Sequence, residues 1–191
     1  MIDIFLQLWG GGFYLINKIL FSFSESKNHN IKNTFKQYAW SAYIIGAPAW
    51  IILLIDKNDW IAASIELGGI PAMLLGLYKT CYKVQANQNI ENTVKYITYS
   101  VILLGLVLSF QHYGGINSLS QFLELGASIG FLMGTYLMSQ NNFKGYLYFM
   151  LMNINMALLM GLQDKYILMT QQFISLLFVI YGYIQSSKIK S

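Results

Sequence analysis

The sequence has few charged residues and no arginine, and both shortages restrict the kind of protein that it can encode. Of its 191 residues, 10% are charged and 55% are hydrophobic, whereas an ordinary soluble domain has about 25% charged residues. So few charges cannot cover the surface of a soluble fold, and lipid is the expected solvent for its apolar surface. Proteins usually recognise phosphates through the guanidinium group of arginine. A net charge of +4 carried entirely by lysine therefore does not indicate nucleic-acid binding.

Cysteine, histidine and enzyme motifs are also scarce. Cys81 is the only cysteine, so no disulfide can form within the chain. His29 and His112 have no cysteine or carboxylate cluster around them in the sequence, and the chain contains no phosphate-binding glycine loop, nucleophile elbow or zinc motif. The sequence therefore predicts a protein that is not an enzyme and that holds no metal or cofactor.

Long apolar stretches are abundant, and each is close to the roughly 20 residues that a helix needs to cross a bilayer. Backbone polar groups must be satisfied internally in lipid, so these stretches are expected to be helices. Residues 1–22 are predicted to be a retained first helix, because Asp3 precedes the apolar run and no basic segment or cleavage site is present. The seven predicted spans are 2–22, 37–55, 60–78, 94–110, 118–139, 146–163 and 166–184.

The lysines predict the orientation of these spans. Connections on one side contain nine lysines, and those on the other side contain only Lys57 and Lys165. Because cytoplasmic loops are enriched in basic residues, the C-terminus is expected in the cytoplasm and the N-terminus outside, in a multi-pass plasma-membrane protein. Lys18 is the exception, and we expect its side chain to extend toward the inner interface.

The two ends of the chain resemble each other, with residues 5–79 corresponding to 122–185. Asp56-Lys57 matches Asp164-Lys165, and after a two-residue offset Glu66 matches Gln172 and Gly76 matches Gly182. A repeated unit of three helices needs one intervening helix to keep its orientation. We therefore expect a 3+1+3 parallel repeat of three-helix bundles, divided as 1–84, a linker helix in 85–115, and 116–191.

The second unit resembles the nicotinamide riboside transporter (PnuC) family, which has a SWEET-like fold. The resemblance rests on Tyr146, Phe149 and Asn153 at the family's aromatic-x-x-aromatic-x-x-x-Asn spacing. It continues through Leu162-Gln163, Tyr166, Gln171-Gln172 and Gly182, with Tyr and Phe standing where the family prefers Trp. It implies a seven-helix transporter of a vitamin precursor, nicotinamide riboside first of all. We expect facilitated diffusion by alternating access, because no paired acidic and basic relay in the sequence indicates ion coupling. The resemblance implies that accumulation is driven by phosphorylation of the cargo in the cytoplasm.

Polar residues inside the predicted spans are the candidate binding residues, because they are costly in lipid unless they face a cavity or a partner. Asn153, Phe149 and Tyr146 share one helix face, where an amide and two rings suit a nucleoside. Asn153 could equally bond a neighbouring helix, which is the role expected of Asn155.

The remaining candidates lie in three other spans. Glu66 and Gln172 hold equivalent places in the repeat, and a buried Glu66 would stabilise a pyridinium cargo. Glu66 could instead be protonated or paired with Lys18. Trp40 is a further candidate, whereas Trp60 is expected to anchor a helix at the interface.

Two other functions remain open at this point. The same fold could carry thiamine, riboflavin, a deoxynucleoside or a sugar, or the chain could be a membrane scaffold that transports nothing. The expected partners are a small-molecule substrate and the lipid bilayer, and assembly into a homo-oligomer stays open.

Overall fold

The computed structural model describes residues 2–25, 29–82, 87–139 and 142–190, which form seven helices. The helices are α1 (Ile2–Ser24), α2 (His29–Asp56), α3 (Trp60–Tyr82), α4 (Gln88–Tyr113), α5 (Leu119–Ser139), α6 (Gly145–Leu162) and α7 (Tyr166–Lys190). The predicted all-α class is therefore confirmed.

Six of these helices are long and apolar enough to cross a membrane, which is the pattern of a multi-pass membrane protein. In α5, the polar side chains of Gln121, Glu124 and Ser128 are buried against other helices, so α5 keeps these polar groups away from lipid.

The helix ends differ from the predicted spans, mainly at the lysine-rich end of the molecule. α2 begins eight residues before the predicted span and α7 continues six residues beyond it. Hydropathy detects only the part of a helix that lies in lipid, and the polar first turns of α2 continue the same hydrogen-bonded helix outside it.

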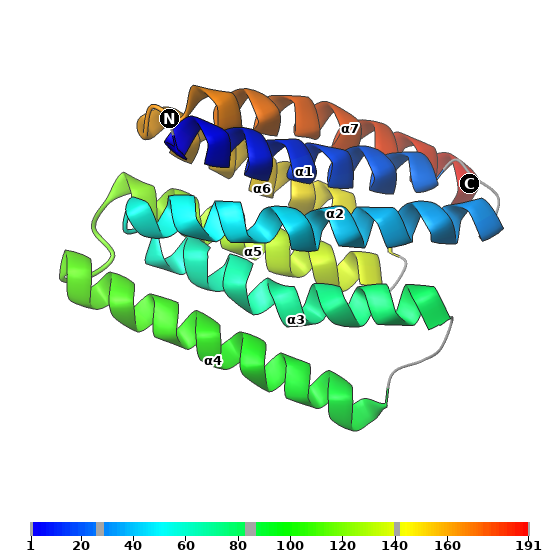
Figure 1. The fold of residues 1–191 in the computed structure, drawn as a ribbon, viewed down its shortest axis with the longest axis horizontal. Coiled ribbons are helices and arrows are strands. Elements are labelled where there is room, and N and C mark those ends of the chain that lie inside the picture. Colours follow the sequence, from blue (N-terminus) through cyan, green and yellow to red (C-terminus); the bar gives the residue numbers. More distant parts are fainter. Residues whose placement is uncertain (1, 26–28, 83–86, 140–141, 191) are drawn as a thin grey trace.

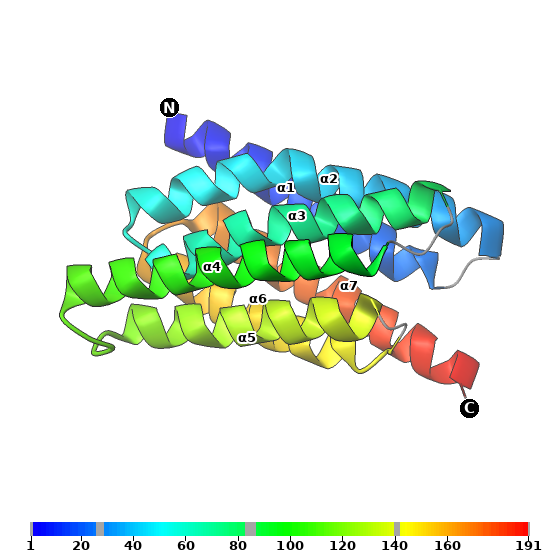
Figure 2. The same cartoon turned by 90° about the horizontal axis from the view of Figure 1, so that it is seen from below.

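Six helices form a closed ring in the order α1, α2, α3, α5, α6 and α7, and α7 packs back against α1. α4 lies outside this ring and packs along α3 (Figure 1). Because neighbouring helices alternate in direction, α1 and α5 begin at the same end of the bundle. Figure 2 shows α1 and α2 along one side of the bundle and α5 along the opposite side.

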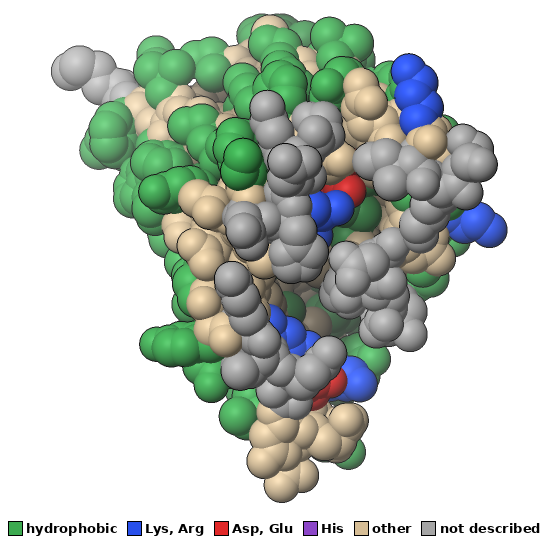
Figure 3. All heavy atoms as spheres, turned by 90° about the vertical axis from the view of Figure 1, so that its right-hand side faces the viewer, with side chains coloured by type: hydrophobic (Ala, Val, Ile, Leu, Met, Phe, Trp, Pro, Cys, Tyr) green, Lys and Arg blue, Asp and Glu red, His purple; other side chains and the backbone are tan. Residues whose placement is uncertain are grey.

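Charged side chains gather at the end of the bundle where α1, α3 and α5 finish. Figure 3 looks onto this end, where lysine side chains lie beside acidic side chains and hydrophobic side chains cover much of the left and upper surface. The ion pairs there include Lys32 with Glu25, at 2.6 Å, and Lys79 with Glu91, at 2.5 Å.

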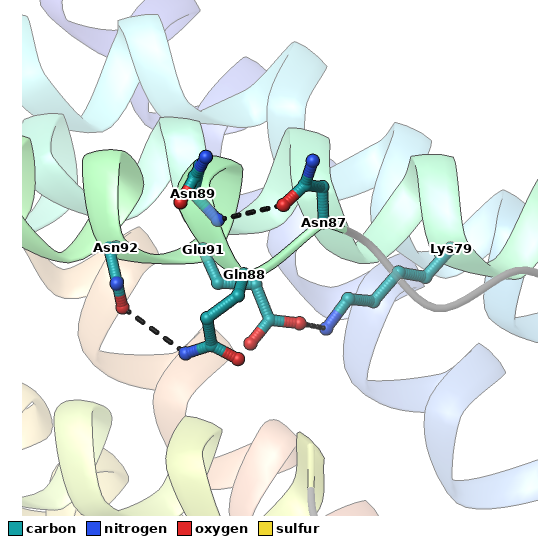
Figure 4. Close-up of polar contacts among 6 residues, drawn as sticks. All are labelled: Lys79, Asn87, Gln88, Asn89, Glu91 and Asn92. Carbon is teal, nitrogen blue, oxygen red and sulfur yellow. Dashed lines mark hydrogen bonds and ion pairs between the residues drawn. The ribbon is translucent and has the colours of Figure 1, made fainter.

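The start of α4 is fixed at this same end by two contacts (Figure 4). The Asn87 side chain accepts a hydrogen bond from the backbone N–H of Asn89 at 3.0 Å, which satisfies one free donor of the first turn. The Lys79–Glu91 ion pair joins the end of α3 to the first turn of α4. α4 is therefore attached to the bundle through α3.

Glycines allow the helices to approach closely, as small residues commonly do in membrane bundles. A Cβ atom built on Gly130 of α5 would lie 2.6 Å from both the Met152 backbone nitrogen and the Tyr148 carbonyl oxygen of α6. A Cβ built on Gly12 of α1 would meet no atom within 4 Å. Gly130 is thus required by backbone-to-backbone packing, and Gly12 is not.

Gly130→Ala is expected to destabilise the bundle by about 1–3 kcal/mol, because α5 and α6 must separate to accommodate the methyl group. Thermal unfolding of the purified protein in detergent would show a lower melting temperature. Gly12→Ala is the matched control and should unfold at the wild-type temperature or slightly above it. Equal melting temperatures for the two variants would contradict the packing described for α5 and α6.

Candidate functional site

Two small cavities lie inside the ring of six helices. The first has a volume of about 30 Å³ and is lined by side chains from all six ring helices, among them Lys18, Trp40, Tyr146 and Phe149. The second, about 20 Å³ by the same measure, is lined by residues that include Glu66 and Gln172. Phe131 lines both cavities, so they share a wall.

The cavities are too small to hold a cargo molecule in this conformation of the helix ring. Each is large enough for one or two water molecules, whereas small-molecule sites usually measure about 300–1,000 Å³. A nucleoside-sized ligand does not fit unless the helices move apart. The structure is therefore a closed arrangement with polar groups at its centre.

A column of aromatic rings runs through this centre and forms the wall between the cavities. Tyr14 stacks on Tyr43 with ring centroids 4.7 Å apart and also contacts Trp50 at 5.4 Å. Tyr43 in turn stacks on Phe131 at 6.0 Å. Because Tyr14 lies on α1, Tyr43 on α2 and Phe131 on α5, the column joins the first three helices to the last three.

Glu66 is held at the edge of this column. Its Oε2 atom accepts short hydrogen bonds from the hydroxyl groups of both Tyr14 and Tyr43. Two phenol donors replace part of the water that a carboxylate loses inside an apolar bundle. The pairing of Glu66 with Lys18 that the sequence left open is not a direct ion pair in the described residues.

Lys18 corrects an expectation from the sequence. Its side chain does not extend to the membrane interface, because it is only 8% exposed and lines the first cavity. The ammonium group lies over the Phe149 ring, 4.2 Å from its centroid, which is cation–π geometry. The helix turns this residue inward because its face of α1 packs against the other ring helices.

The six predicted binding residues fall into three groups. Trp40, Tyr146 and Phe149 line the first cavity, and Glu66 and Gln172 line the second. Asn153 lines neither cavity, although it is 1% exposed. Its Nδ2 donates to the Phe149 carbonyl oxygen of its own helix at 2.7 Å, and its Oδ1 is buried without a hydrogen-bond partner.

Four central residues were missed from the sequence, namely Lys18, Tyr14, Tyr43 and Phe131. One signal could have found Tyr43, since Trp40, Tyr43 and Trp50 recur at helical spacing and so share a face. Nothing in the spacing of α1 distinguishes Tyr14 from its other apolar neighbours. Within the described part of the chain, no three histidine, cysteine or acidic side chains meet as metal ligands would.

The end of the bundle opposite the lysines is closed by polar contacts between the two halves. Asp59, in the α2–α3 turn, accepts hydrogen bonds from Ser120 of α5 at 3.2 Å and from Gln163 of the α6–α7 turn. Lys165, in the α6–α7 turn, forms an ion pair with Asp3 of α1. The α2–α3 turn thus contacts α5, and the α6–α7 turn contacts α1.

Burial changes the chemistry of Asp59. The side chain is 1% exposed, and desolvation raises the pKa of its carboxyl group to about 6, although the Gln163 and Ser120 hydrogen bonds lower it in part. The Asp59 carboxyl group, which joins the α2–α3 turn to α5 and to the α6–α7 turn, therefore changes its protonation state near pH 6.

The fold and the central cavities define a multi-pass membrane protein with a polar site inside a ring of helices. Comparison with known protein families, with curated proteins and with solved structures finds no match for this chain.

The pH dependence of stability tests the burial of Asp59. The folded protein binds this proton more tightly than the unfolded chain, so stability should fall as the pH rises from 3.8 through about 6. Asp59→Asn should make this slope shallower, by roughly 1–3 kcal/mol over the range. Melting temperatures measured between pH 4 and pH 8 would show it.

Asp56→Asn is the matched control, because Asp56 is exposed and only three residues away. This variant should keep the wild-type slope. If Asp59→Asn also keeps it, the titrating group lies elsewhere.

Proposed function

We propose that this protein transports a small, planar, polar molecule across the plasma membrane by alternating access, with nicotinamide riboside as the cargo that residues 118–186 indicate by resemblance. The observation that carries the proposal is the pair of adjacent cavities inside the helix ring. Between them they place a lysine, a carboxylate and an amide among aromatic side chains. Charged and polar groups at this depth are expensive, and their usual role in membrane proteins is to line a substrate pathway.

The arrangement of contacts supports the 3+1+3 parallel repeat. α1 packs on α2 and α2 on α3, as α5 packs on α6 and α6 on α7. The polar contacts at the end of the bundle correspond as well. The α2–α3 turn contacts the start of α5 through Asp59 and Ser120, and the α6–α7 turn contacts the start of α1 through Lys165 and Asp3. Two similar units that meet around a central site can rock against each other, which is how parallel repeats give alternating access.

The site chemistry suits a planar cargo. Phe149, Tyr146 and Trp40 offer ring faces and edges for stacking, and Glu66 can offset the positive charge of a pyridinium ring. The cavities must widen for such a cargo to enter, so the closed structure is an intermediate between states open to either side. In the absence of a driving ion, transport would be facilitated diffusion, with cytoplasmic phosphorylation removing the cargo.

A membrane scaffold is the second candidate, and the observation that favours it is the small volume of both cavities. A scaffold would show no stabilisation by ligands, whereas a ligand that binds only the folded state raises the melting temperature. A thermal-shift screen with nicotinamide riboside, thiamine, riboflavin, a deoxynucleoside and a sugar would separate the scaffold from the transporter and would rank the alternative cargos.

Asn153 lies outside both cavities of the closed structure, but its buried Oδ1 atom has no hydrogen-bond partner and can accept from the cargo once the helices separate. Asn153→Ala removes this acceptor and is expected to reduce uptake of nicotinamide riboside into proteoliposomes by about tenfold. Asn155→Ala is the matched control on the same helix. Its amide also bonds the carbonyl oxygen four residues earlier, at 2.8 Å, but it packs against Gly126 of α5.

Uptake by the Asn155 variant should stay within about twofold of the wild type. If Asn153→Ala leaves both binding and transport unchanged, Asn153 is not part of the binding site.

The proposed orientation places the lysine-rich end in the cytoplasm. Cys81 is exposed at that end, so a membrane-impermeant maleimide should label it only after cells are opened. A variant that combines Cys81→Ser with Lys57→Cys, in the opposite connection, should be labelled in intact cells. The reverse pattern would invert the topology.

A further inference from the structure

We propose that Lys18 binds a carboxylate of the cargo, so that the central site takes a planar ring that carries one negatively charged oxygen group. This inference rests on the proposed transport function and refines its cargo, because it expects the carboxylate analogue of nicotinamide riboside to bind more tightly than nicotinamide riboside itself.

The ammonium group of Lys18 has unused hydrogen-bonding capacity. It carries three donors, and it is buried in the wall of the first cavity with the Phe149 ring as its close contact. Within the described residues it forms neither a hydrogen bond nor an ion pair. A buried ammonium is stabilised best by a charged acceptor, and the cavity that it lines is where an acceptor can enter.

Glu66 does not fill this role. It lines the second cavity, and the hydroxyl groups of Tyr14 and Tyr43 occupy its Oε2 atom. The ring of Tyr43, which lines the first cavity, forms part of the wall between the two. A lysine on one side of this wall and a carboxylate on the other leave each cavity with a charge of its own.

The Thr135 hydroxyl also lines the first cavity, is buried without a hydrogen-bond partner, and can donate. The second cavity presents one acceptor and one donor that are buried without a partner, the Oε1 atom of Gln172 and the Nε1 atom of Trp50. The first cavity therefore complements an acceptor, and the second complements a group that both donates and accepts hydrogen bonds.

The rings determine the shape of the cargo, and the single lysine determines its charge. Phe149 beside the ammonium group offers a face on which a flat ring can stack. One lysine balances one negative charge, as a carboxylate carries, whereas a phosphate monoester carries about two. When the two halves separate, a flat molecule can place its carboxylate at Lys18 and its hydroxyl groups or cationic ring toward Glu66 and Gln172.

Nicotinic acid riboside and nicotinamide riboside are a matched pair for the test, because they differ only in a carboxylate against a carboxamide. Binding to the purified protein in lipid nanodiscs would be measured by calorimetry, and uptake into proteoliposomes in parallel. The wild type is expected to bind the acid about tenfold more tightly than the amide, which is a typical gain for a hydrogen bond between charged groups.

Lys18→Gln should weaken binding of the acid by about tenfold and should change binding of the amide by less than about threefold. Lys95→Gln is the matched control, since Lys95 is exposed on α4 outside the ring, and it should keep the wild-type preference. If Lys18→Gln does not fold, Lys18→Met is measured in its place, and equal binding of the two compounds by the wild type still overturns the role of Lys18.

The outcomes separate the two proposals. Equal binding of acid and amide by the wild type, or a preference for the acid that persists in Lys18→Gln, overturns the role of Lys18 and leaves transport standing. If the wild type neither binds nor transports either compound, the proposed function fails together with this inference.

Discussion

The contact between a glycine and an aromatic ring on a neighbouring helix sets the spacing of the whole bundle. A Cβ atom on Gly134 would lie 2.8 Å from the Phe149 ring, and one on Gly182 would lie 2.7 Å from the Tyr146 ring. Gly76 faces Trp40 in the same way, at 3.1 Å. Since lipid tails are as apolar as the helices, close packing of this kind drives association in a membrane. The same contacts place the rings that line the first cavity.

This packing explains how a lysine and a carboxylate can coexist at the centre of an apolar ring. Glu66 has two phenol donors in place of water, and Lys18 has the face of Phe149. Neither arrangement replaces full hydration, because burying a charge is costly unless it is paired and hydrogen-bonded. The centre of the bundle is therefore polar and incompletely satisfied, which favours a site that exchanges its contacts over one that only holds the helices together.

The helices were predictable because a span is defined by the summed hydropathy of about 20 residues, which no single substitution obscures. The grouping of Trp40, Tyr146 and Phe149 in one cavity followed in part from helical spacing. Lys18 was placed wrongly, because hydropathy gives the depth of a residue and not the side of the helix on which it lies. Tyr14 and Tyr43 were missed because a tyrosine in an apolar run looks the same whether its hydroxyl group reaches lipid headgroups or a carboxylate on another helix.

α4 contributes little to the enclosed ring, since it packs mainly along α3 and reaches α5 through the hydrogen bond from Gln121 to Ser109, yet it determines how the rest of the chain can be built. Three helices leave the chain on the opposite side of the bilayer from where it started. Without the crossing by α4, the last three helices would run in the reverse direction, and α5 would begin at the end of the bundle far from Asp59. The insertion of α5, α6 and α7 therefore requires α4, whose outer surface can change in sequence as long as it stays hydrophobic enough to cross the membrane.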